Sequence, residues 1–132
     1  MTMDLRNQFS RGQTVCNAGS QAGDFYLHKN VAMPQGGGDF KALRLIVGTA
    51  FEGLASGMRV TIESDTVYTF NSTLREEASA PILLPARLTA GAIIDIPLPR
   101  GNPDLDWQAF WRIYYNQISE VATAGTITAG LI

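Results

Sequence analysis

The sequence is poor in the residues that small proteins use as covalent or metal staples. It has one cysteine and one histidine, whereas a structural zinc site takes several such ligands. Cys16 therefore has no internal disulfide partner, and no His, Lys or Arg stands beside it to make it a reactive thiolate. We expect a buried structural thiol, and neither a bound metal nor any other cofactor.

The sequence also lacks the patterns of the common catalytic sites. Residues 53–57 (GLASG) place the serine one position too late for a nucleophile elbow, so the single histidine, His28, has no matching nucleophile motif. Glu76 and Glu77 are neighbours, and on a strand their side chains would point to opposite faces, which excludes a glycosidase pair formed by these two. We therefore expect a protein that is not an enzyme.

The charged residues are few and mixed in sign. Ten basic and twelve acidic side chains give a net charge of −2 and form no basic stripe, so we expect no nucleic-acid partner. No apolar run approaches the roughly 18 residues of a membrane-spanning helix, and residues 1–13 carry charges where a signal peptide needs an apolar stretch. The expectation is a protein made in the cytoplasm, soluble there, with no membrane partner.

What the sequence does contain is period-2 alternation typical of half-buried strands. Within residues 57–64, for example, Met58, Val60 and Ile62 alternate with polar residues. Strands are predicted over residues 14–17, 25–29, 41–49, 57–64, 66–71, 81–84, 91–97, 109–119 and 123–132, and residues 73–78 are either an edge strand or a solvated loop. The length of 132 residues fits one domain over residues 1–132, with residues 1–9 as a short N-terminal arm. About eight short antiparallel strands without an amphipathic helix predict an all-β, jelly-roll β-sandwich.

The strongest predicted strand is also the richest in aromatic residues. On a strand its side chains would divide into one face with Trp111, Ile113 and Tyr115 and another with Phe110, Arg112 and Tyr114. One face must fill the core, and the other combines aromatic rings with Arg, a composition enriched at protein interfaces and on sugar-binding platforms. The plainer alternative to an interface is that both faces of the strand are covered within the same chain, by a second sheet or by a loop. The candidate protein-interface residues are Trp107, Phe110, Arg112 and Tyr114.

Four blocks of the sequence resemble one known family. They are residues 51–56 (FEGLAS) before an alternating strand, residues 88–91 (LTAG) before an apolar strand that ends in PLP at 97–99, residues 111–115 (WRIYY), and residues 123–131 (TAGTITAGL). Their order and spacing resemble those of the jelly-roll capsid cement (decoration) proteins of tailed bacteriophages, of the Bordetella-phage type. The blocks are structural and contain no chemical motif, so the resemblance concerns fold and lineage.

The resemblance implies a structural virion protein on the outer capsid surface, made in the host cytoplasm. Such proteins bind the outside of the icosahedral shell after it expands and bridge neighbouring major capsid subunits. The implied partners are the phage major capsid protein and further copies of the same chain, as a homodimer first and a trimer second. The alternative is a carbohydrate-binding jelly-roll module on the virion surface or tail.

Overall fold

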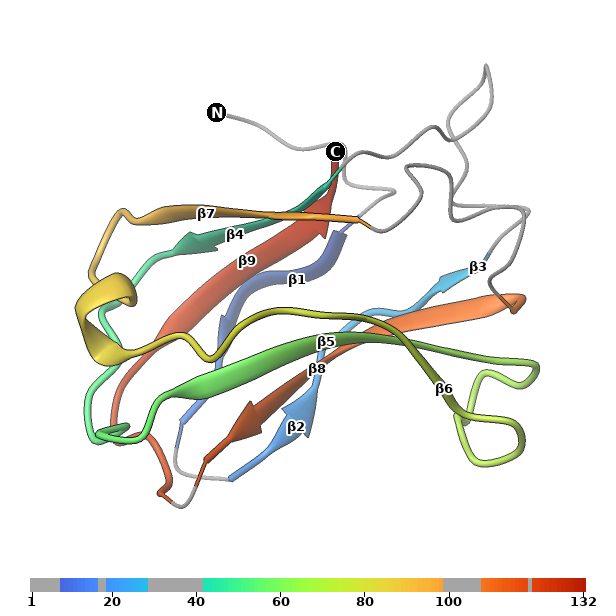
Figure 1. Ribbon diagram of the computed structural model, residues 1–132, viewed down its shortest axis with the longest axis horizontal. Coiled ribbons are helices and arrows are strands. Elements are labelled where there is room, and N and C mark those ends of the chain that lie inside the picture. The colour runs from blue at the N-terminus through green and yellow to red at the C-terminus, as the bar shows by residue number, and fades with distance from the viewer. Residues whose placement is uncertain (1–7, 17–18, 29–41, 99–107, 119) are drawn as a thin grey trace.

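The fold is built almost entirely from antiparallel strands. The computed structural model describes residues 8–16, 19–28, 42–98, 108–118 and 120–132 (Figure 1). The elements of these residues are β1 (Gln8–Thr14), β2 (Gln21–Ala22), β3 (Leu27–His28), β4 (Ala42–Val47), β5 (Met58–Asp65), β6 (Arg75–Ser79), the 3-10 helix η2 (Pro85–Arg87), β7 (Ile93–Pro97), β8 (Phe110–Gln117) and β9 (Thr126–Leu131).

The strands form two sheets in the order expected of a jelly roll. One sheet has the order β1-β9-β4-β7 and the other β2-β8-β5-β6, with β3 also paired to β8. Strands β2 and β3 lie on the same edge of β8, so they act as one edge strand interrupted by residues 23–26. With β2 and β3 taken together, the chain passes repeatedly from one sheet to the other, and Figure 1 shows the two layers facing each other. The predicted jelly-roll β-sandwich is thus confirmed.

The core lies between the two sheets and draws on both. Leu45 of β4 and Ile127 of β9 come from one sheet, and Trp111 and Tyr115 of β8 come from the other, and all four are fully buried. Each side chain alternates with an outward neighbour because successive strand residues point to opposite faces. The C-terminal strand β9 lies between β1 and β4, so it is internal to its sheet.

A buried polar chain joins β1 of one sheet to β8 of the other. The Tyr115 hydroxyl lies 2.8 Å from Ser10 Oγ, which donates to Gln13 Oε1 at 2.7 Å. Gln13 then holds the segment between β2 and β3, because its Nε2 donates to the Ala22 carbonyl at 2.9 Å and its Oε1 accepts from the Asp24 backbone N–H at 2.8 Å. Burial raises the pKa of the Tyr115 phenol, so the hydroxyl stays neutral.

The structure corrects the expected N-terminal arm. Strand β1 begins at Gln8, and Phe9 is fully buried, so the arm expected over residues 1–9 does not extend to its last two residues. The strand escaped notice because its pairing with β9 slips twice, between Gln8 and Ser10 and between Ser10 and Gln13. Gly12, at φ +58°, breaks the alternation further, since that backbone conformation favours glycine.

Three further expectations have different outcomes. Residues 66–71 form turns and no strand, so that prediction was wrong. Within residues 81–84 only Leu83 is paired, through an isolated bridge to Met58. For residues 73–78 the sequence allows either an edge strand or a solvated loop, and the structure has β6 there, at the edge of its sheet.

The contrast between two isoleucines on strands tests the assigned layers. Ile127→Ala removes a fully buried side chain and should lower the free energy of unfolding by about 2–5 kcal/mol. Ile93→Ala truncates a side chain that is 53% exposed and should cost less than about 1 kcal/mol. Urea unfolding followed by tryptophan fluorescence measures both, and equal losses would contradict the assignment of inward and outward faces.

Candidate functional site

Strand β8 separates a core face from an outward face as predicted. Trp111, Ile113 and Tyr115 are fully buried, whereas Phe110, Arg112 and Tyr114 are only partly buried. The structure thus brings three of the four candidate interface residues onto one surface. The fourth, Trp107, lies outside the described residues.

Further aromatic residues from other segments join Phe110. Tyr26 comes from the segment between β2 and β3, and Tyr68 and Phe70 come from the loop between β5 and β6. The ring centroid of Tyr26 lies 6.1 Å from that of Tyr68, 6.5 Å from that of Phe70 and 5.7 Å from that of Phe110. These are the distances of favourable aromatic pairs. We call these four residues the aromatic cluster.

Arg112 connects the aromatic cluster with the rest of the outward face. Its guanidinium carbon lies 4.7 Å from the ring centroid of Phe70 and 5.4 Å from that of Tyr114. Its Nε donates to Oε1 of Glu63, the residue opposite it on β5, at 2.7 Å. The ion pair neutralises the guanidinium. Among the described residues, its two terminal nitrogens have no hydrogen-bond partner.

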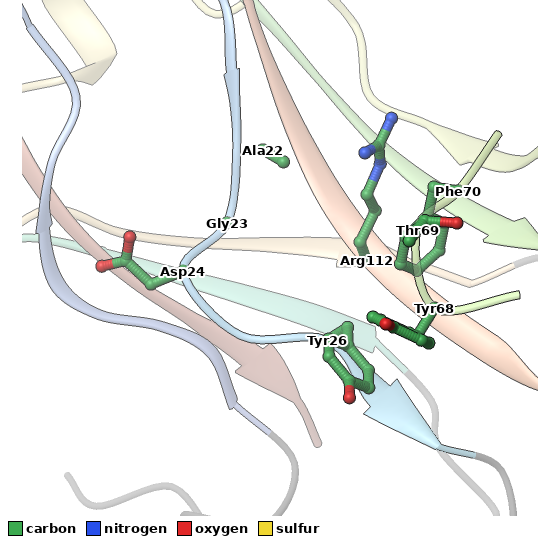
Figure 2. Close-up of a pocket in the computed structure, with 8 residues that line it drawn as sticks. All are labelled: Ala22, Gly23, Asp24, Tyr26, Tyr68, Thr69, Phe70 and Arg112. Carbon is green, nitrogen blue, oxygen red and sulfur yellow. The ribbon is translucent and has the colours of Figure 1, made fainter.

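A small open pocket lies beside the aromatic cluster. Its volume is about 180 Å³, which is below the roughly 300–1,000 Å³ of pockets for drug-sized ligands. Figure 2 shows Tyr26 and Tyr68 next to each other and Arg112 beside Phe70, whereas the carboxylate of Asp24 points away from them. We call it the aromatic pocket; it is lined by Ala22, Gly23, Asp24, Tyr26, Tyr68, Thr69, Phe70 and Arg112.

One buried carboxylate organises the loop that carries Tyr68 and Phe70. Asp65 Oδ1 accepts from the backbone N–H groups of Val67 and Thr73, both at 3.1 Å. Its Oδ2 accepts from the backbone N–H of Ser72, also at 3.1 Å. Phe70 within this loop has φ +53°, a conformation that a bulky residue rarely adopts. The three backbone hydrogen bonds that Asp65 accepts close the loop and hold Phe70 there.

The loop geometry is reflected in the ionisation of Asp65. Burial by itself would raise the pKa of Asp65, but the backbone hydrogen bonds from Thr73, Ser72, Val67 and Thr66 together outweigh burial and lower it to about 2. Asp65 is therefore a carboxylate at neutral pH. Gln108 supports the loop from the other side, since its Nε2 donates to the carbonyls of Thr73 at 2.6 Å and Ser64 at 3.0 Å.

Metal-ligating side chains, the lone thiol and apolar helices are the other candidate features of the described part of the chain. No group of three or more His, Cys, Asp or Glu side chains there is arranged to hold a metal ion. Cys16, expected to be buried, is only partly buried. No helix among those residues is long and apolar enough to cross a membrane. The aromatic cluster with Arg112 is accordingly the strongest candidate site, and its chemistry suits binding.

Comparison with known proteins gives no further identification. No family model matches the chain, and no curated protein matches it.

Replacing Asp65 tests the link between the carboxylate and the loop. Asp65→Asn puts an amide nitrogen where one acceptor stood, facing a backbone N–H, so it should lower the melting temperature at neutral pH. Because the folded-state pKa is about 2 and the ordinary value is 3.8, the wild-type advantage should be complete above about pH 4 and shrink as the pH falls towards 2. Thermal melts of both proteins across this range measure the effect.

Asp95→Asn is the matched control. The pKa of Asp95 is lowered too, by its hydrogen bond to Arg44, but the side chain is 42% exposed and solvent weakens the ion pair. It should change the melting temperature less at neutral pH. An Asp65→Asn difference that stays constant from pH 7 to pH 2 would contradict the assigned role.

Proposed function

We propose that this protein is a capsid cement protein that binds the outer surface of an expanded icosahedral phage capsid. It bridges neighbouring major capsid subunits and stabilises the shell by binding, without catalysis. The jelly-roll order of the strands and the four sequence blocks support the proposal. The strongest support comes from the outward face of β8. There, partly buried aromatic rings and Arg112 alternate with fully buried core residues.

The shell contact is proposed at the part of this face that follows Arg112 along β8, where Tyr114 adjoins the aromatic pocket through Arg112. Tyr114 is partly buried, and Asn116 and Arg59 are exposed. Asn116 and Arg59 lie opposite each other in the register of β8 and β5. We call these three residues the β8 contact patch. Tyr and Arg are enriched among the residues that dominate binding energies, and a rigid strand costs little entropy to dock.

The energetic requirement for this function is modest. A ligand that binds the intact shell but not its separated subunits stabilises the shell by about 2.7 kcal/mol at a hundredfold excess over Kd. A standard contact of about 800 Å² per partner suffices for specific binding. A homodimer, our first choice over a trimer, would engage two shell subunits at once and gain avidity from the second contact. With a net charge of −2, binding should depend little on moderate salt.

Capsid rupture provides the test of function. Saturating wild-type protein should raise the rupture temperature of expanded capsids that lack it, and unexpanded procapsids should bind less. Tyr114→Ala should weaken binding about tenfold because it removes the aromatic ring of the β8 contact patch.

Tyr68→Ala is the matched control for Tyr114→Ala. It also truncates a partly exposed tyrosine, but one that lies on the loop between β5 and β6 and lines the aromatic pocket. It should bind capsids as the wild type does. Rupture temperatures that are equal with and without saturating wild-type protein would overturn the proposed function, and loss of binding in Tyr68→Ala alone would move the contact to the aromatic cluster.

A further inference from the structure

We propose that the aromatic pocket binds a single uncharged sugar ring of a surface glycan, a binding activity separate from the shell contact. The pocket brings together two well-exposed tyrosine rings, a guanidinium with unpaired donors and a loop held in a strained conformation. Asp65 holds the loop in this conformation, and it leaves the two tyrosine rings exposed beside Arg112 donors that have no partner among the described residues.

The rings supply the apolar part of sugar recognition. Tyr26 is 50% exposed and Tyr68 is 61% exposed, although both lie within an aromatic cluster whose other rings are more covered. Their planes are inclined by only 31°, so the two rings border the pocket as neighbouring platforms. The C–H face of a pyranose stacks on such a ring, while each tyrosine hydroxyl remains free to reach a polar group.

Arg112 supplies the polar part of sugar recognition, and its ion pair with Glu63 favours an uncharged ligand. Its two terminal nitrogens are donors without partners among the described residues, and Arg112 lines the pocket. Glu63 already neutralises the guanidinium, so an anionic ligand would gain little from it. The carboxylate of Asp24 points away from the rings (Figure 2), so a cation finds no counter-charge beside them. Hydroxyl groups of an uncharged sugar match these donors best.

The size and rigidity of the pocket favour a ligand with a single sugar ring. A volume of about 180 Å³ leaves room for a single ring, being smaller than the roughly 300 Å³ at which drug-sized pockets begin. Phe70 has a φ of +53°, and backbone strain of this kind concentrates at ligand clamps. Gly23 lines one wall of the pocket. A Cβ there would lie 2.5 Å from Ile113 Cγ2, so only glycine lets this segment pack against β8. A ligand that binds to this preformed wall does not have to order the protein, so no conformational entropy of the wall is lost on binding.

The test is an NMR titration of the full-length protein with the methyl pyranosides of glucose, galactose, mannose and N-acetylglucosamine. At least one should shift the ring resonances of Tyr26 and Tyr68, with a Kd on the order of 1 mM, as expected for a ligand this small. Tyr68→Ala should weaken that binding about tenfold or more, whereas Tyr68→Phe, which keeps the ring, should retain most of it. Ile93→Ala, which truncates an exposed side chain on the opposite sheet, should bind the sugar as the wild type does.

Three results would overturn the inference. The first is that none of the four glycosides shifts the two tyrosines. The second is that the shifts persist unchanged in Tyr68→Ala. The third is that methyl glucuronide binds more tightly than every uncharged glycoside, which would make the pocket an anion site. Capsid rupture measured on the same variants distinguishes this inference from the proposed function, because Tyr68→Ala should weaken sugar binding and leave capsid stabilisation intact.

Discussion

Strand β8 lies between β5 and the β2–β3 edge, and its eight residues must therefore serve two surfaces at once. Because successive side chains point to opposite faces, Trp111, Ile113 and Tyr115 fill the core, while Arg112 and Tyr114 face outward. A slip of one residue in its pairing would exchange the two sets. The buried chain from Tyr115 through Ser10 to Gln13 opposes such a slip, since it places one hydroxyl against one acceptor. Core packing and the candidate binding surface thus depend on the same register.

The aromatic rings that do not belong to β8 are positioned by polar side chains and not by strand pairing. Gln13 holds the segment that carries Tyr26, and Asp65 closes the loop that carries Tyr68 and Phe70. Both positioning side chains are buried, so their hydrogen bonds compete little with water. The sheet supplies a rigid base, and the two polar anchors bring exposed rings to its edge. This division lets the loops present their rings without weakening the core.

The sheet strands with regular alternation could be predicted from the sequence, and those with interrupted alternation could not. Strands β4, β5 and β9 follow a period of two, whereas the bulged β1 does not, which is why the buried Phe9 was assigned to an arm. Residues 66–71 have strand-like composition, but the hydrogen bonds of Asp65 to the backbone turn the chain there. An Asp followed by Thr and Ser residues is the signal that could have indicated this loop. The aromatic cluster was missed because only tertiary structure brings its three segments together.

The central claim is that the outward face of β8 binds the capsid. Imaging of shells that carry the bound protein tests this claim most directly. Expanded capsids saturated with the protein and reconstructed by electron cryo-microscopy should show jelly-roll density that bridges neighbouring major capsid subunits. The β8 contact patch of Arg59, Tyr114 and Asn116 should face the shell, with the aromatic pocket left open to solvent. Saturated capsids without ordered extra density, or with density attached through the opposite sheet of β1, β9, β4 and β7, would contradict it.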